Sequence, residues 1–128
     1  MVRQVTAGVS VSVETFYQEE QSNPVQFEYL FAYRITIENQ TSTPIQLKTR
    51  HWHIVESSGI RREVKGEGVV GEQPIIEPGA YYQYISAASL RADIGKMYGT
   101  YLMEDLYTKK EFSVDIPEFK LIPPFKMN

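Results

Sequence analysis

The sequence predicts an all-β protein in which two antiparallel β-sheets pack face to face as a sandwich. About seven short segments alternate between apolar and polar residues with a period of two, turn-forming residues separate them, and no convincing helical pattern interrupts them. The composition agrees, because the 9 Tyr, the 6 Phe and the many Val, Ile and Thr residues favour half-buried pleated surfaces. A small closed barrel is the alternative architecture for the same strands.

The first two strands are expected over residues 5–17 and 27–37. In both, the odd-numbered positions carry most of the apolar and aromatic side chains. The second strand is the stronger case, because one side collects Phe27, Tyr29, Phe31, Tyr33, Ile35 and Ile37. This is the pattern of a strand with one face packed and the other in water. A polar loop ending at Pro24 separates the two strands, and turn-forming residues 39–44 follow the second.

The third strand is expected over residues 45–55 and a short fourth strand over 60–64, joined by a turn at 56–59. A regular third strand places on one face Ile45, Leu47, Thr49, His51, His53 and Val55. Its other face then carries Gln46, Lys48, Arg50, Trp52 and Ile54. The two histidines are therefore expected opposite to Arg50 and Trp52.

Three more strands are expected over residues 80–87, 97–104 and 110–116, with a turn at 77–79 and a hairpin loop at 105–109. Residues 89–96 have room for one short helical turn, which Gly95 stops, and Gly99 suggests a bulge or a close backbone approach. Three prolines, Pro117, Pro123 and Pro124, argue against a regular ladder in the tail. The apolar tail residues that hold it to the body, or else offer a docking surface, are Phe119, Leu121, Ile122 and Phe125.

Composition narrows the class of protein. A chain of 128 residues has the size of one domain, so a single domain over 1–128 is expected, without repeat or linker. The net charge of -3 and the scattered basic residues lack the electrostatic footprint of a nucleic-acid-binding protein. The absence of Cys excludes disulfides, Cys-ligated zinc and thiol nucleophiles. No apolar run approaches the length of a membrane span or a signal peptide, so a soluble, cytoplasmic protein is predicted.

A glycine-rich stretch at residues 65–79 separates the earlier strands from the later ones. Gly66, Gly68 and Gly71 give it the spacing G-x-G-x-x-G. A dinucleotide-binding loop needs a helix after the last glycine, and Pro74 and Pro78 prevent one here. The preferred interpretation is that these glycines permit tight turns with positive φ. An anion-binding nest of backbone amides remains the alternative. The loop that would bind an anion or a partner comprises Gly66, Glu67, Gly68, Val69, Val70, Gly71 and Glu72.

His51 and His53 project from the same face of the third strand and are candidate ligands for one metal ion. The candidate third ligands are Glu67, Glu72, Glu104 and Asp105. The favoured interpretation places one imidazole in the core with a hydrogen-bond partner and the other on the surface. No G-x-S-x-G motif surrounds any serine, and no other complete catalytic set occurs, so no catalytic residue is assigned.

Several stretches closely resemble the bacterial ApaG family, in matching order and spacing. They are Arg50–Ile54, Val64–Pro74, the turn at 77–79 and Met97–Tyr101. The resemblance implies an immunoglobulin-like or fibronectin type III-like sandwich, with Gly66, Gly68 and Gly71 as hallmark residues. It also implies a link to cobalt resistance and magnesium efflux without an established catalytic activity. Similar domains are fused to eukaryotic F-box proteins and to a DNA-polymerase-interacting protein, which implies a partner-binding module.

We therefore expect a non-enzymatic domain that binds a protein partner of unknown identity. The expected surface comprises residues 51–54 and 66–74, together with Arg50 and Trp52. The alternative is a small-ligand sensor, which binds a phosphate-type anion at the glycine-rich loop or a divalent ion such as Co²⁺ or Mg²⁺ at His51 and His53. A nucleotide hydrolase is the least favoured hypothesis. No cofactor beyond such a divalent ion is expected. Pairing of exposed sheet edges into a homodimer is left open.

Overall fold

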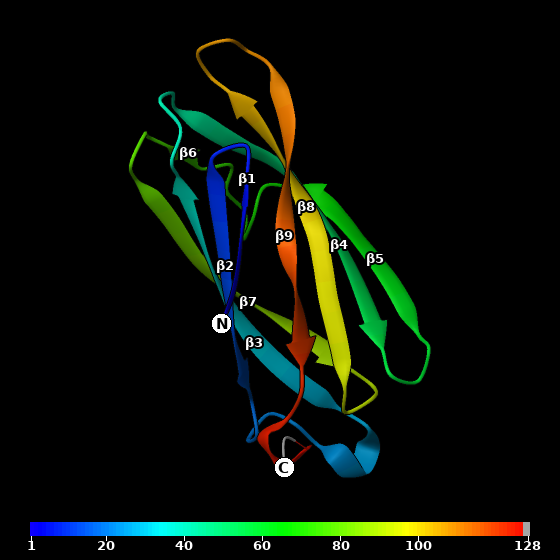
Figure 1. The fold of residues 1–128 in the computed structure, drawn as a ribbon. Helices are drawn as coiled ribbons and strands as arrows, with labels where there is room; N and C mark the ends of the chain where they lie inside the picture. Colours follow the sequence, from blue (N-terminus) through cyan, green and yellow to red (C-terminus); the bar gives the residue numbers. More distant parts are fainter. Residues whose placement is uncertain (127–128) are drawn as a thin grey trace.

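The computed structural model describes residues 1–126, which fold into nine β-strands and two short 3₁₀ turns (Figure 1). The first five strands are β1 (Val2–Thr6), β2 (Val9–Tyr17), β3 (Tyr29–Asn39), β4 (Ile45–Glu56) and β5 (Arg61–Glu67). The remaining four are β6 (Ile75–Ile76), β7 (Tyr81–Leu90), β8 (Gly95–Asp105) and β9 (Glu111–Leu121). The 3₁₀ turns are η1 (Pro24–Gln26) and η2 (Pro124–Lys126). Over these residues, no helix is long and apolar enough to cross a membrane.

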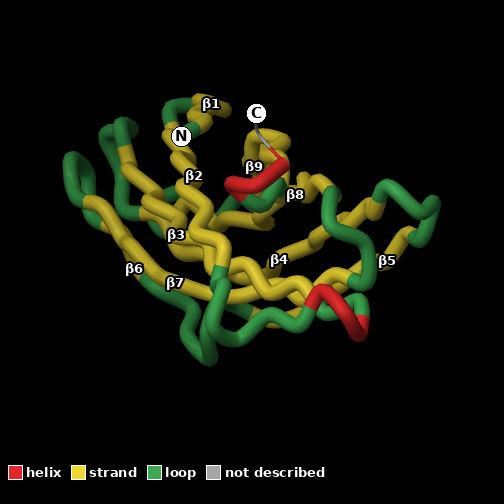
Figure 2. The backbone as a smooth tube through the Cα atoms, turned by 90° about the horizontal axis from the view of Figure 1, so that it is seen from below, coloured by secondary structure: helices red, strands yellow, loops and turns green. Residues whose placement is uncertain are grey.

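The strands form two antiparallel sheets with the orders β1-β2-β3-β7 and β5-β4-β8-β9, and β6 pairs with β4. Figure 2 shows the two layers from below, with β3 and β7 in one and β4 and β8 in the other. The predicted antiparallel β-sandwich of the immunoglobulin-like class is thus confirmed. The layers meet along β1 and β9, where the Asp115 amide donates to Thr6 Oγ1 at 3.2 Å (Figure 1). The edge strands β5 and β7 lie on the opposite side of the sandwich.

The core lies between the inner faces of the two sheets. One layer contributes side chains from β2, β3 and β7, and the other contributes side chains from β4, β8 and β9. The largest fully buried side chains include Phe31, Ile35, Leu47, Tyr101 and Leu121. Burying such a side chain stabilises the fold by roughly 1.5–3 kcal/mol relative to leaving it exposed, so the alternating pattern determines which face turns inward.

The predicted first strand over 5–17 is wrong at its start, because two strands occupy this stretch. Ala7 and Gly8 have φ of 50° and 80°, and they connect β1 to β2 with Thr6 opposite Val9. Positive φ at both central residues matches the twist of a two-residue hairpin turn. The second strand also begins later than predicted, since Phe27 has φ 56° and is 62% exposed.

The predicted faces of the third strand are wrong at its start, because β4 contains a β-bulge. Its register with β8 shifts between Leu47 and Thr49. The extra residue reverses the alternation, so Leu47 before the bulge and Trp52 and Ile54 after it are all buried. Leu47 therefore does not share a face with His51. The bulge allows Arg50 and Trp52 to point between the sheets, and the histidines are turned to the outer face.

The end of the chain is more regular than predicted. β7 continues to Leu90, where a short helical turn had been expected, and β9 continues through Pro117 to Leu121. A second register shift, between Met97 and Gly99 of β8, places Pro117 within a bulge of β9. Gly99 also makes the predicted close approach, since a Cβ there would lie 2.1 Å from the His51 carbonyl oxygen. Phe119 and Leu121 are buried core residues and do not offer a docking surface.

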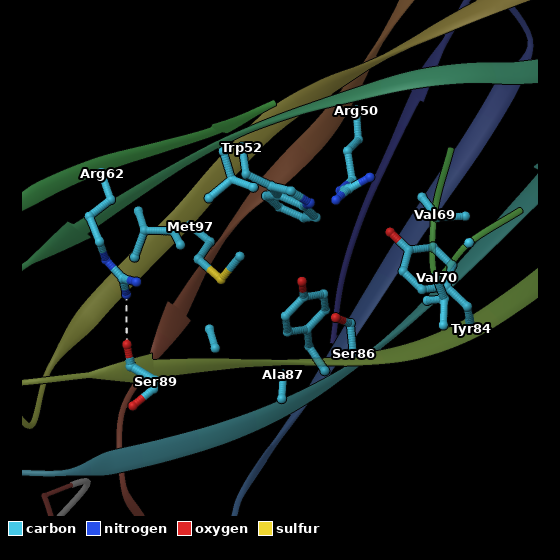
Figure 3. A pocket seen from close by; sticks show the side chains of 15 residues that line it. Arg50, Trp52, Arg62, Val69, Val70, Tyr84, Ser86, Ala87, Ser89 and Met97 are labelled. Carbon is cyan, nitrogen blue, oxygen red and sulfur yellow. Dashed lines mark hydrogen bonds between the residues drawn. The ribbon is translucent and has the colours of Figure 1, made fainter. Parts of the chain in front are cut away.

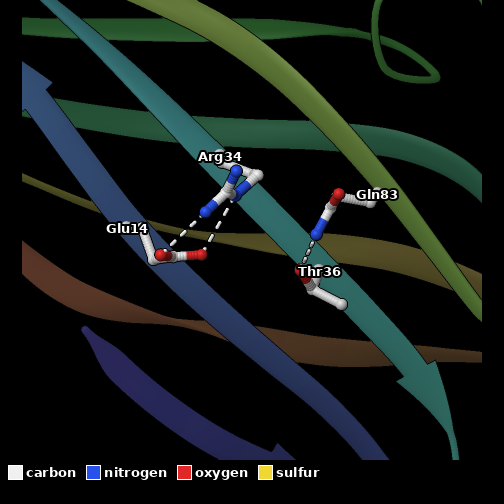
Figure 4. A network of polar contacts seen from close by, with 4 residues as sticks. All are labelled: Glu14, Arg34, Thr36 and Gln83. Carbon is white, nitrogen blue, oxygen red and sulfur yellow. Dashed lines mark hydrogen bonds and ion pairs between the residues drawn. The ribbon is translucent and has the colours of Figure 1, made fainter.

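Polar pairs cover the outer face of the four-stranded sheet (Figure 4). The guanidinium of Arg34 on β3 donates to both carboxylate oxygens of Glu14 on β2, at 3.0 and 2.9 Å, and Gln83 donates to Thr36 Oγ1 at 2.9 Å. The hydrogen bond from Arg34 lowers the pKa of Glu14. Because these pairs meet solvent, they add little stability, and they share this face with the exposed apolar side chains of Phe16 and Ile85.

Candidate functional site

A cleft of about 360 Å³ opens between the two sheets at the edges formed by β5 and β7. Its lining includes Tyr33, Arg50, Trp52, Arg62, Val69, Val70, Gly71, Tyr84, Ser86 and Met97. Figure 3 shows Arg50 and Trp52 reaching from β4 toward Tyr84 and Ser86 of β7. The glycine-rich loop and the third predicted strand, which are neighbours only through the fold, thus form one site with β7.

Trp52 forms the apolar base of the cleft. Its side chain is 3% exposed, and its ring meets the rings of Tyr33 and Phe119 edge-on, with centroids 5.6 and 5.8 Å apart. Edge-to-face contacts of this kind add stability beyond the area they bury. Trp52 was predicted to lie on a surface that binds a partner. In the structure its side chain is buried, and a partner would contact it only by entering the cleft.

Arg50 connects strand β4 to the glycine-rich loop. Its Nη1 donates to the carbonyl oxygens of Glu67 and Gly68 at 3.0 and 2.9 Å. A Cβ at Gly66 would lie 2.7 Å from the same nitrogen, so the absent side chain makes room for the guanidinium. The first glycine of the motif therefore provides space for a side chain of this protein. The G-x-G-x-x-G spacing alone did not indicate this role.

The rest of the loop is a tight turn, as the sequence predicts. The amides of Val69 and Glu72 each donate to the other residue's carbonyl oxygen, at 2.8 and 3.0 Å, around Val70 and Gly71 with φ of 48° and 80°. Gly68 has φ 63°, and a Cβ there would lie 2.1 Å from the Glu72 carbonyl oxygen. The Gly68 amide donates to the carbonyl oxygen of Lys48 at 2.9 Å. An anion held by the amides of Gly68, Val69 and Glu72 would have to replace these backbone bonds.

Val70 is strained and exposed at the mouth of the cleft. Its φ of 48° lies in the left-handed region, which β-branched residues rarely adopt, and its side chain is 63% exposed. Neither packing nor backbone preference therefore explains a valine at this position. A strained residue at a surface site is a reason to look for function there.

Tyrosine hydroxyls line the inner wall. The hydroxyl of Tyr84 pairs with that of Tyr101 behind it, and burial raises the pKa of both phenols. Burial also raises the pKa of Tyr33. These groups stay uncharged near neutral pH, so the cleft offers aromatic surface and hydroxyls beside the fixed positive charge of Arg50.

A second arginine lies on the β5 side of the cleft. Arg62 Nη2 donates to the Ser89 carbonyl oxygen at 2.6 Å, which joins edge strand β5 to edge strand β7 (Figure 3). Its Nε lies 4.0 Å from the buried carboxylate of Glu56. The sequence did not single out Arg62 as a site residue, because only the packing of the sheets brings it to the cleft.

The two histidines lie together on the outer face of the five-stranded sheet, away from the cleft. Their ring centroids are 4.5 Å apart, and the carboxylate near them belongs to Glu63 of β5. The candidate third ligands Glu67, Glu72, Glu104 and Asp105 do not join this cluster. Asp105, for example, accepts hydrogen bonds from the Tyr107 and Thr108 amides in its own hairpin loop. Cross-strand register, which the sequence does not reveal, selects Glu63 instead.

Comparisons with known proteins give one consistent result. The profile of the family described as "ApaG domain" matches residues 19–105. Proteins named "Protein ApaG" from Brucella anthropi and Brucella suis are 47% and 44% identical to the chain over 124 residues, covering 97% of it and 95% of each relative. The crystal structure of the putative ApaA protein from Bordetella pertussis is 42% identical and superposes with a TM-score of 0.88, covering 91% of this chain and 94% of that one. A structural genomics target solved by X-ray crystallography is 38% identical, with a TM-score of 0.89 and coverage of 98% and 94%.

Proposed function

The chain belongs to the ApaG family, and from that premise we propose that it is a non-enzymatic domain that binds a protein partner at the cleft between its sheets. The observation that carries this proposal is Val70, an exposed apolar residue kept in a strained conformation at the cleft mouth. Binding benefits from such a side chain because an apolar anchor that is rigid before contact loses little entropy on contact.

The chemistry of the cleft supports binding over catalysis. Its lining side chains are aromatic, aliphatic, hydroxyl-bearing or guanidinium groups. Acid–base catalysis near neutral pH needs a group that gains and loses a proton there, whereas burial raises the pKa of Tyr33 and Tyr84 further from that range. Serine nucleophiles need an adjacent base, and the residues that line the cleft beside Ser86 include no His, Asp, Glu or Lys.

The partner that fits is an extended protein segment with an acidic side chain. Arg50 and Arg62 place positive charge on the cleft, and Trp52 and Tyr84 supply aromatic surface. The neighbouring edge strands β5 and β7 add main-chain groups that an extended segment can pair with. We further propose that the protein works in the cytoplasm. The family's link to cobalt resistance and magnesium efflux then results from binding of this partner.

Affinity capture with matched variants tests the proposal. The wild-type protein and the Val70→Asn and Val25→Asn variants are each immobilised. The proteins that each of them retains from a cell lysate are then compared. Val25 is 89% exposed in the η1 turn, so it controls for loss of a surface valine outside the cleft. A specific partner is retained by wild type and by Val25→Asn and is lost with Val70→Asn. Retention that is equal on all three surfaces would refute the cleft as the binding site.

A small-ligand sensor is the second candidate, favoured by the volume of the cleft and by Arg50. About 360 Å³ is within the usual size of a small-molecule site, and a guanidinium suits a phosphate-type anion. The sensor could alternatively respond to a divalent ion at His51 and His53. A thermal-shift panel of phosphate, ATP, diadenosine tetraphosphate, Mg²⁺ and Co²⁺ separates the candidates. A ligand at a hundredfold excess over Kd stabilises by about 2.7 kcal/mol, so no response to any of them excludes a sensor for these five ligands.

A further inference from the structure

We propose a transition-metal site on the outer face of the five-stranded sheet, formed by His51 and His53 of β4 and Glu63 of β5. The site gives the sensor candidate a defined ligand set and therefore rests on that second candidate function. It lies on the opposite face of β4 from the cleft, so its failure leaves the partner-binding proposal standing.

The three side chains already approach the spacing of metal ligands. His51 Nε2 lies 3.5 Å from one carboxylate oxygen of Glu63, and His53 Nδ1 lies 3.7 Å from the other. The three prospective ligand atoms all lie within 4.8 Å of one another. Ligands of a tetrahedral zinc ion, at 2.0–2.1 Å from the metal, are about 3.4 Å apart. Closing this site therefore requires only small side-chain rotations.

An independent observation, an unpaired buried nitrogen, supports a ligand site at the same place. The Nε2 atom of His51 is buried and has no hydrogen-bond partner among the described residues, because its contact with Glu63 does not meet the geometry of a hydrogen bond. Buried polar nitrogens are rarely left unpaired, and an unpaired one calls for a bound ion or water. A metal ion between His51 and Glu63 would satisfy this nitrogen.

The surrounding sheet holds both rings in place. His53 stands opposite Glu63 in the β4–β5 register, and its ring stacks on Tyr98 of β8 with centroids 4.9 Å apart and an interplanar angle of 11°. The close approach of Gly99 to the His51 carbonyl oxygen locks the neighbouring backbone. Ligands placed on strands and supported in this way need little ordering when the ion binds.

The donor set determines the class of ion. Two imidazoles and one carboxylate suit Zn²⁺ and related borderline ions, whereas Mg²⁺ prefers an all-oxygen shell. Three protein ligands leave a fourth position for water or an outside group. A depression beside the histidines is also lined by Thr100 of β8 and Asp115 of β9.

Zinc titration of the untagged protein tests the site by calorimetry and by NMR of the imidazole rings. The chain has 2 His, so single substitutions assign both ring signals. One Zn²⁺ per chain is expected, with both rings shifting together and with no binding of Mg²⁺. His51→Gln, His53→Gln and Glu63→Gln should each weaken zinc binding by more than about tenfold.

Glu67→Gln and Glu111→Gln are the matched controls, because each removes the same charge outside the cluster, from β5 and β9 respectively. Both should bind zinc like the wild type. Zinc that fails to bind, that binds without moving the ring signals, or that depends on Glu67 and not on Glu63 would overturn the proposal. The first two of these outcomes are read on the wild-type protein, so they do not depend on how any variant folds.

Discussion

The guanidinium of Arg50 passes over Gly66 and donates a hydrogen bond to the carbonyl oxygen of Gly68 at 2.9 Å. This bond joins a strand in the middle of a sheet to the loop that carries Val69 and Val70. The position of the loop at the rim of the cleft therefore depends on a side chain that comes from the strand at its base. Strand β4 can position the loop only because the β-bulge after Leu47 turns Arg50 inward.

Arg50→Lys should loosen the loop while leaving the sandwich folded. A single ammonium cannot reproduce the planar guanidinium that bonds with both Glu67 and Gly68, so we expect a loss of about 1–2 kcal/mol in the free energy of unfolding. Amide hydrogen exchange at Val69 and Glu72 should accelerate. Arg61→Lys, on the exposed edge strand β5, is the control. Equal exchange rates in wild type and Arg50→Lys would show that the bond does not hold the loop.

Gly99→Ala should be among the most destabilising single substitutions in the chain. The new Cβ would meet the His51 carbonyl oxygen at 2.1 Å, and backbone atoms of two paired strands would have to separate. We expect a loss of more than about 3 kcal/mol in urea unfolding. Gly59→Ala is the control, because Gly59 has φ 97° and open space around it. That change should cost only about 1–2 kcal/mol, from backbone strain alone.

Stability should fall steeply above pH 10 because of the buried tyrosines. Burial raises the pKa of Tyr84 and Tyr101 above the ordinary value of 10.0, so the fold favours their uncharged forms. Their contribution is complete below the unfolded-state pKa and is lost as the pH rises above it. Each such tyrosine should add about 1.4 kcal/mol per pH unit to the decline.

Urea unfolding at several pH values from 9 to 11 measures this decline. Tyr101→Phe should make the slope shallower, although it leaves the Tyr84 hydroxyl without its partner and lowers stability at neutral pH. Tyr107 is 81% exposed, so Tyr107→Phe should leave the slope unchanged. A slope that is the same in wild type and Tyr101→Phe would contradict the assignment.

Most of the strands could be predicted from sequence because one face of each is buried, which is not the case for the edge strands β1 and β5. The alternation over 29–37 and the onset of β4 at Ile45 follow directly from this requirement. The hairpin turn at Ala7 and Gly8 could not be seen, since odd-numbered Val5 and Ala7 continue the apolar alternation of β2 in the sequence, although the turn places even-numbered Thr6 on the same side as Val9. The bulge after Leu47 was also hidden, because it is a property of the pairing between β4 and β8 and not of β4 alone.

The candidate sites were predictable only in part, for the same reason. Sequence pattern and family resemblance pointed to Arg50, Trp52 and the glycine-rich loop. The contributions of Tyr84 and Arg62 come from the packing of one sheet on the other, and that of Glu63 comes from strand register. No local pattern encodes these long-range relationships. Nor did the sequence reveal that Val70 has a positive φ, because valine is an unfavourable choice there.

The strain at Val70 predicts an unusual combination of effects for Val70→Asn. Asparagine tolerates the left-handed conformation much better than a β-branched residue does. The free energy of unfolding should therefore rise by about 1 kcal/mol, while the apolar side chain at the cleft mouth is lost. Natural proteins accept such strain chiefly where function requires it.

Partner binding by Val70→Asn, measured on the same preparations as urea unfolding, tests the central claim most directly. The account predicts a variant that is more stable than the wild type and that no longer retains the partner, whereas Val25→Asn retains it. A more stable Val70→Asn protein that binds the partner as well as the wild type would contradict the proposal that the cleft is the binding site.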